Sequence, residues 1–413
     1  MPQTHPAPKG RTRLAAAATG AALVAGVGGL VIAGAPAANA ADQNLNKSFA
    51  YSCDLYDSAT PTGTPLVPNN AVGVNARVVV PTSVAPNQLI GARKTQITLT
   101  MPEDLRKATY GLLGGRKAGG RSNDASITIA DSGSASLTVP IRNLASPPVT
   151  VPSAVGASWT IPTQGDVPAI KLPSTATGTG TLTMPARFTV LAQIYKADNS
   201  KLDVSLDCSI TSTDKTLGTI AISGTAYRDA RLTAAATTAT YGRASRITAR
   251  LSAAVGGRVD AYVGTRRIGA ANVSGTTASI PVSGTALRPG AYTVTLRHSG
   301  AARVNPVAAV NTRLTVRKAG SSLAAKVSPK KIRAKRTKAK VSVTVRTSGF
   351  KATGRVTAKV GKKTVGKGTV RNGKVTIKLK KFKKKGTYRV KLTYGGSAYA
   401  NGSTKTVKVK VRR

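Results

Sequence analysis

Apolar and polar residues alternate with a period of two along the C-terminal part of the chain. The pattern is clearest in Val341–Val345, Val375–Leu379, Tyr388–Leu392 and Val407–Val411. Successive side chains of a β-strand point to opposite faces, so the apolar set of each segment can face one core. A disordered basic tail would have no such apolar face to bury. The pattern therefore predicts a folded β domain at this end of the chain.

Positive charge increases along the chain in steps. The 413 residues carry a net charge of +48, and residues 319–413 contain 30 Lys or Arg and no Asp or Glu. Residues 1–40 carry +3, residues 41–231 carry +4 and residues 232–318 carry +11. Such a gradient indicates separate modules with different surfaces. Because aromatic residues are sparse and long amphipathic helical patterns are absent, we expect an all-β, three-module chain of β-sandwiches.

The N-terminal 40 residues have the layout of a secretory signal peptide. Lys9, Arg11 and Arg13 precede an apolar run over residues 14–34, and Ala38–Ala40 supplies small residues for cleavage. A transmembrane anchor is the alternative, because the run approaches the length of a membrane span. The many Ala and Gly residues make this run only weakly apolar, which favours a cleaved signal peptide over a transmembrane anchor. We therefore expect a secreted protein, extracellular or associated with the cell wall, with no transmembrane anchor in the mature chain.

Short β patterns separated by Pro and Gly fill residues 41–230. A short helix is expected to begin at Pro102, because Glu103 and Asp104 suit the positive N-terminal end of a helix dipole. Residues 114–123 are so rich in glycine that we expect an irregular, mobile tip there.

Cys53 and Cys208 are the two cysteines of the chain. An even number of cysteines in an exported protein predicts one disulfide, and two buried free thiols are the alternative.

Several motifs of residues 48–222 carry a resemblance to a known family. They are Tyr51–Cys53, Leu137–Pro140, Pro148–Gly156, Gly178–Gly180, Leu206–Cys208 and Thr216–Thr219. The segment resembles a β-rich secreted domain of unknown function that is widespread in actinobacteria and is typically followed by immunoglobulin-like repeats. The resemblance implies a fold and a location, and no chemistry.

Residues 232–413 contain an internal repeat. Residues 257–264 match residues 354–361, and residues 290–296 match residues 386–392. We expect two domains, residues 232–318 and 323–413, each with the length of an immunoglobulin-like sandwich. Both units resemble bacterial immunoglobulin-like repeats.

Two pairs of residues are predicted to be equivalent in these units. Tyr292 and Tyr388 stand where a tyrosine corner would fall, and ordinary half-buried strand tyrosines are the alternative. Leu296 and Leu392 are expected to point into the two cores.

The residues needed for catalysis are scarce, and we expect no catalytic residue, cofactor or metal site. His298 is the single histidine beyond the signal peptide, and it is expected to be a solvated loop residue rather than a catalytic base. A zinc site would need three or four ligands that the chain lacks. The alternative is a carboxylate-based hydrolase hidden in residues 41–230, for which the candidate pairs are Glu103 with Asp104, Asp54 with Asp57, and Asp203 with Asp207.

Two basic runs in the last unit are the candidate binding site. They are formed by Lys330, Lys331, Arg333, Lys335 and Arg336, and by Lys380, Lys381, Lys383, Lys384 and Lys385. Basic clusters bind polyanions by releasing counterions. We expect retention at the cell envelope through anionic cell-wall polymers. Extracellular DNA is the alternative partner, and a merely solubilising surface is the alternative role.

Overall fold

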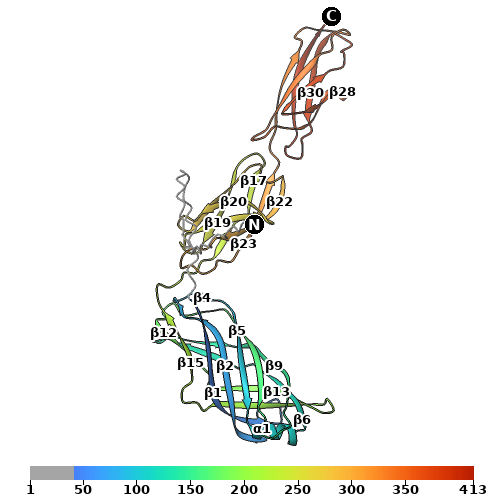
Figure 1. Ribbon diagram of the computed structural model, residues 1–413. Coiled ribbons are helices and arrows are strands. Elements are labelled where there is room, and N and C mark those ends of the chain that lie inside the picture. Colours follow the sequence, from blue (N-terminus) through green and yellow to red (C-terminus); the bar gives the residue numbers. More distant parts are fainter. Residues whose placement is uncertain (1–40) are drawn as a thin grey trace, which may run out of the picture. The chain divides into compact units, whose positions relative to one another are not determined.

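The computed structural model describes residues 41–413, which form β-sheets with very little helix (Figure 1). The predicted signal peptide, residues 1–40, lies outside the described residues. Helical segments among residues 41–413 are α1 (Glu103–Lys107) and the π-helical turn η1 (Ala108–Leu112). Neither has the length and apolar character that a membrane-crossing helix requires. The all-β prediction is confirmed.

Eight antiparallel strands of the first module, which we define as residues 41–222, pair in a closed ring. In order of pairing they are β1 (Asp42–Tyr56), β14 (Lys201–Ile210), β13 (Arg187–Lys196), β6 (Gly115–Ser122), β9 (Arg142–Thr150), β10 (Trp159–Val167), β5 (Arg93–Met101) and β2 (Val67–Pro81). A second sheet contains β3 (Ser83–Val84), β15 (Thr216–Ile222), β12 (Gly178–Thr183), β7 (Ser126–Ala130) and β8 (Ser136–Pro140), and β4 (Leu89–Ile90) pairs with β11 (Ile170–Lys171).

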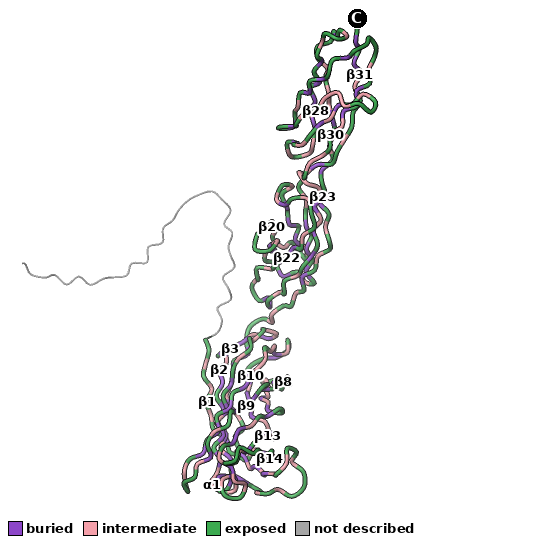
Figure 2. The backbone as a smooth tube through the Cα atoms, turned by 90° about the vertical axis from the view of Figure 1, so that its right-hand side faces the viewer, coloured by how far each residue is buried: buried purple, intermediate pink, exposed green. Residues whose placement is uncertain are grey.

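Alternating side chains of these strands fill one apolar core. Phe49 and Tyr51 on β1 and Val72 and Val74 on β2 are buried, while the residues between them are more exposed. The alternation of buried and exposed positions along the strands is visible in Figure 2. Each large apolar side chain removed from water stabilises the fold by about 1.5–3 kcal/mol.

Two local predictions for this module had different outcomes. The short helix expected after Pro102 is α1, with Glu103 and Asp104 in its first turn. The irregular tip expected over residues 114–123 is wrong, because Gly115–Ser122 forms strand β6 between β13 and β9.

The glycines of β6 are explained by close packing rather than by a loop. A Cβ atom at Gly119 would lie 2.9 Å from the backbone nitrogen of Pro148, and one at Gly120 would lie 2.9 Å from the carbonyl oxygen of Leu191. Glycine inside a strand commonly marks such a close approach of another backbone segment.

The two predicted repeats have the same sheet topology. Repeat A contains a three-stranded sheet of β16 (Leu232–Ala234), β18 (Ser245–Leu251) and β21 (Thr277–Val282), and a five-stranded sheet of β17 (Thr237–Thr240), β23 (Val310–Arg317), β22 (Gly290–His298), β19 (Arg258–Val263) and β20 (Arg266–Asn272). Repeat B contains β24 (Ser322–Ser328), β26 (Lys340–Arg346) and β29 (Lys374–Lys378), with β25 (Ile332–Arg333), β31 (Ser403–Arg412), β30 (Gly386–Tyr394), β27 (Gly354–Val360) and β28 (Lys363–Val370) in the larger sheet. Both are immunoglobulin-like sandwiches, as predicted.

Equivalent residues occupy equivalent places in the two repeats. The Tyr292 hydroxyl donates to the Arg288 carbonyl oxygen at 2.9 Å, and the Tyr388 hydroxyl donates to the Lys384 carbonyl oxygen at 2.9 Å. This bond back to the preceding loop is the mark of a tyrosine corner, so that prediction is confirmed. Leu296 and Leu392 are both fully buried, also as predicted.

Candidate polyanion interface

The two predicted basic runs occupy separate loops of repeat B. The first run extends from just before the short strand β25 to just after it. The second run lies in the loop that connects β29 to β30. The side chains of both runs are exposed: Lys330, Lys331, Arg333, Lys335, Arg336, Lys380, Lys381, Lys383, Lys384 and Lys385.

Backbone contacts bring parts of these runs together. The Lys335 backbone nitrogen donates to the Phe382 carbonyl oxygen at 2.8 Å. Strand β25 pairs with β31, with Arg333 opposite Arg412, and the Ala334 backbone nitrogen donates to the Arg412 carbonyl oxygen at 2.9 Å. Residues far apart in the sequence thus form one basic region, which we call the basic cluster: Arg333, Lys335, Lys380, Lys381, Lys383, Lys384, Lys385 and Arg412.

A buried aromatic ring fixes the lysine-rich loop. Phe382 is 6% exposed, and its ring centroid lies 4.4 Å from that of Tyr388. The Tyr388 hydroxyl in turn binds the carbonyl oxygen of Lys384. Because Phe382 points into the core, the lysines on either side of it are turned toward solvent. The basic loop therefore has a defined backbone and is not a free tail.

Repeat B has no side-chain carboxylate with which to neutralise these charges. Its stretch of sequence contains no Asp or Glu. Within residues 41–413, each ion pair uses an acidic residue no later than Asp260, as in the pair between Arg267 and Asp260 at 2.8 Å. The positive charges of the basic cluster remain available to an external anion. When a polyanion binds to such a surface, the counterions of the polyanion are released. The affinity of the surface for the polyanion therefore falls steeply as the salt concentration rises.

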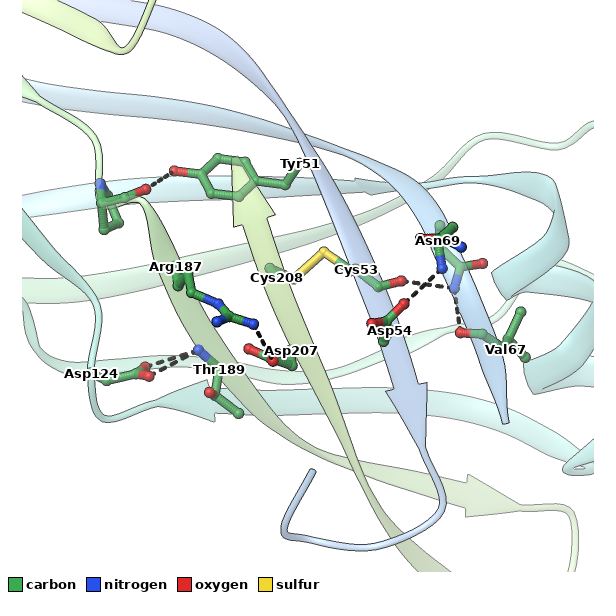
Figure 3. Close-up of a disulfide and its surroundings, with 12 residues drawn as sticks. Tyr51, Cys53, Asp54, Val67, Asn69, Asp124, Arg187, Thr189, Asp207 and Cys208 are labelled. Carbon is green, nitrogen blue, oxygen red and sulfur yellow. Dashed lines mark hydrogen bonds and ion pairs between the residues drawn. A yellow bond between two sulfur atoms is a disulfide. The ribbon is translucent and has the colours of Figure 1, made fainter. Parts of the chain in front are cut away.

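The first module contains the predicted disulfide. Cys53 on β1 and Cys208 on β14 lie directly opposite each other and are bonded (Figure 3). The bridge joins residues 155 positions apart, and the chain-entropy model gives a loop of this length about 5 kcal/mol of stabilisation. Beside it, the Tyr51 hydroxyl donates to the Pro185 carbonyl oxygen at 2.9 Å, and burial raises the pKa of Tyr51.

Four of the six candidate carboxylates of the hydrolase alternative are engaged in local contacts. Glu103 accepts two hydrogen bonds of 2.7 Å from the guanidinium group of buried Arg106, and these hold the pKa of Glu103 at about 2. Asp54 accepts a bond from the Asn69 backbone nitrogen at 2.7 Å.

The third carboxylate pair is also tied to neighbouring strands. Asp207 forms an ion pair with Arg187 at 3.3 Å, and Asp203 accepts a bond from Gln193 at 2.9 Å. These contacts give Glu103, Asp54, Asp203 and Asp207 a structural role at strand surfaces and loop ends.

His298 has a structural role at the end of β22. Its Nδ1 atom accepts a hydrogen bond from the Gly300 backbone nitrogen at 3.1 Å, and its Nε2 atom lies 2.8 Å from the Gly256 carbonyl oxygen. This arrangement suits the neutral ring protonated at Nε2, which links two loops of repeat A. The expectation of a solvated loop residue is corrected in this respect, because the ring is half-buried and bound to both loops.

Two small apolar cavities lie inside the first module. Their volumes are about 40 and about 50 Å³, and Ile127 and Ile141 border both. Among the described residues that line these two cavities there is no Asp, Glu or His. Nor does any group of three or more potential metal ligands occur among residues 41–413. The basic cluster of repeat B is consequently the most distinctive candidate site.

Part of this site was not predicted from the sequence. The two long basic runs were assigned to it, but Arg412 and the basic residues in the middle of the strands, although expected on outward strand faces, were not. The two-residue alternation predicts that such side chains face outward, and the structure has Arg389, Lys391, Lys408 and Lys410 on the outer face of β30 and β31.

A comparison with known protein families agrees with the β-rich domain predicted for residues 41–230. Residues 50–218 match a family of unknown function, DUF6801. This supports the unknown-function β-rich domain inferred from the sequence. No curated protein matches the chain.

The chain is also similar to several solved structures. Fibronectin(III)-like modules of CbhA from Clostridium thermocellum are 18% identical, with 44% of this chain and 94% of that chain covered and a TM-score of 0.20. The titin domains I67–I69 are 11% identical, with 80% and 94% covered and a TM-score of 0.30. The immunoglobulin-like fold of the two repeats follows from the strand topology described above.

Proposed function

We propose that this is a secreted, non-catalytic modular protein that is held at the cell envelope by repeat B. The basic cluster would bind anionic wall polymers such as teichoic or teichuronic acids. Repeat A would act as a spacer, and the first module would present any specific recognition. The observation that carries the proposal is the backbone bond from Lys335 to Phe382, which joins two basic segments in a module without Asp or Glu.

The rival partner is extracellular DNA, which offers the same kind of charge. The basic cluster contributes no fully exposed ring for base stacking, because Phe382 is buried and the Tyr388 ring is half-buried against it. Stacking on aromatic side chains is a major source of affinity for single-stranded nucleic acids. We therefore favour a polymer without bases over a single-stranded nucleic acid, and competition with duplex DNA distinguishes the remaining alternative.

Binding of the full chain to isolated cell walls at increasing salt tests the proposal. The test variant replaces Lys380, Lys381, Lys383, Lys384 and Lys385 with Gln. The matched control removes five charges from exposed positions of repeat A by replacing Arg250, Arg266, Arg288, Arg313 and Arg317 with Gln. With a slope of about 0.7 per contact, the test variant should lower the salt slope by about 3.5, and the control should change it much less.

Two results would overturn the proposal. The first is binding that persists unchanged at about 1 M salt, where the screening length is only about 3 Å. The second is an equal loss in both variants, which would mean that net charge rather than the basic cluster determines binding. Displacement from the walls by DNA at lower concentration than by wall polymer would favour the nucleic-acid alternative.

A further inference from the structure

Like charges face each other across three strand pairs on the outer face of the larger sheet in repeat B. Arg333 of β25 is opposite Arg412 of β31. Arg389 of β30 is opposite Lys408 of β31, and Lys391 of β30 is opposite Lys359 of β27. All six side chains are exposed. We call these six residues the paired cations.

This arrangement destabilises the isolated module. Side chains directly opposite on neighbouring strands have Cβ atoms about 5 Å apart, and like charges in such positions repel. Repeat B has no side-chain carboxylate that could compensate. Solubility alone would be served by cations dispersed singly or mixed with anions. The smaller sheet has one such pair, Lys340 opposite Lys378. The repetition of the costly arrangement at three sites of one face indicates that an external anion is expected there.

Repeat A has the same fold without the like-charge pairs. Its equivalents of the first two pairs are Thr240 opposite Arg317 and Thr293 opposite Arg313. Tyr262 opposite Thr295 corresponds to the third. The equivalence follows from the two tyrosine corners, since Thr293 and Arg389 each directly follow the corner tyrosine. The sandwich therefore does not require a cation on both strands at these positions.

We propose that the paired cations form a track for a linear phosphodiester polymer that crosses β25, β31, β30 and β27. This inference rests on the proposed function. It specifies the chemistry of the polymer that repeat B would bind, and it adds Lys359, Arg389, Lys391 and Lys408 to the binding site. Neighbouring strands lie about 4.8 Å apart, and outward residues recur about every 7 Å along a strand. A flexible polymer whose successive phosphates are separated by about 4.8–7 Å can therefore contact one pair of the paired cations after another.

The polymer that this track fits is one without bases. The outward positions of β30 and β31 are occupied by Arg, Lys and Thr. The two tyrosines of β30 do not offer free rings: Tyr394 is 1% exposed, and Tyr388 is half-buried against Phe382. A glycerol phosphate polymer matches this surface, whereas a single-stranded nucleic acid would leave its bases unstacked.

The test compares two triple variants of the full chain with synthetic glycerol phosphate polymer as the probe. The track variant, R333T/R389T/K391T, gives each pair the threonine that repeat A has there. The control, K326T/R346T/K374T, removes three exposed charges from the smaller sheet of repeat B, where they face Ser342, Ser322 and Thr344. Both variants have the same net charge.

We expect the track variant to lower the salt slope by about 2 and to weaken binding about tenfold at low salt, with a much smaller loss in the control. In the track variant, the thermal transition of repeat B should also lie about 4 °C higher than in the parent, because the repulsion between the paired cations has been removed. The charge-preserving variant R333K/R389K/K391R should bind like the parent, which separates loss of charge from loss of structure.

The possible failures are distinguishable. If the parent chain binds neither the polymer nor cell walls, the proposed function itself is wrong. If the parent binds but the two triple variants lose affinity equally, the track is wrong and the proposed function stands. Tighter binding of oligothymidylate than of a glycerol phosphate polymer with equal charge would overturn the assignment of a base-free ligand.

Discussion

Repeats A and B are two versions of one sandwich with different outer surfaces. Their strands pair in the same order, their corner tyrosines make the same hydrogen bond, and Leu296 and Leu392 fill equivalent core positions. Repeat A places threonines, arginines and a tyrosine at the outer positions where repeat B has the paired cations. The inward half of the alternating pattern thus determines the fold, and the outward half is free to change.

The two repeats also differ in whether a side-chain carboxylate balances any of their positive charges. In repeat A, the carboxylate of Asp260 is held by Arg258 and Arg267 at 3.2 and 2.8 Å. Repeat B has no counterpart to Asp260, and its cations face one another. This unbalanced surface is the basis of the proposal that repeat B binds a polyanion.

The largest expected effect tests the shared core. Leu296→Ala and Leu392→Ala should each destabilise their own repeat by about 3 kcal/mol, because each removes a fully buried side chain and leaves a cavity. Hydrogen exchange read by mass spectrometry can follow the two repeats separately. A loss below about 1 kcal/mol in either repeat would contradict the equivalence of the two cores.

A smaller effect tests the tyrosine corners. Tyr292→Phe and Tyr388→Phe each remove one hydroxyl bond of 2.9 Å to a loop carbonyl oxygen. The expected loss is about 1 kcal/mol in both repeats, measured by the same hydrogen exchange. In repeat B the change should also loosen the loop that presents the lysines, because its bond to Lys384 is lost. Unchanged exchange in residues 380–386 would contradict this role.

Acid should weaken the first module before it weakens repeat B. Hydrogen bonds from Arg106 and Lys47 lower the pKa values of Glu103 and Asp214 to about 2, from ordinary values of 4.5 and 3.8. A carboxyl whose pKa is lower in the folded state stabilises the fold above its unfolded pKa. That contribution is lost as the pH falls toward 2.

Repeat B has no side-chain carboxyl to titrate in this range. Fluorescence of the chain's single tryptophan, the buried Trp159, reports on the first module. Its thermal transition should move to lower temperature between pH 5 and pH 2, while hydrogen exchange in repeat B changes little. Equal acid sensitivity in the two regions would contradict the assignment of these carboxylates as stabilising groups.

The sequence was sufficient for features that depend on a short, regular pattern. Strand alternation predicted the all-β fold, the similarity between segments predicted the repeat, and the even cysteine count predicted the bridge between Cys53 and Cys208. It was insufficient where a residue type has two physical uses. The glycines of β6 suggest a loop when read locally, but Gly119 and Gly120 are needed because other strands approach closely.

The candidate site shows the same limit. Runs of lysine such as Lys383–Lys385 can be recognised from composition alone. The pairing of Arg389 with Lys408 or of Lys359 with Lys391 depends on strand register, which connects residues that are distant in the sequence. Sequence reasoning therefore identified the basic character of repeat B but not the arrangement of its cations.

The most direct test of the central claim is the binding of the full chain to isolated cell walls before and after chemical removal of their anionic polymers. We expect strong binding to intact walls at low salt, with release as salt rises, and near-complete loss of binding to stripped walls. Binding to stripped walls that equals binding to intact walls and resists about 1 M salt would contradict the claim that repeat B binds the protein to a polyanion.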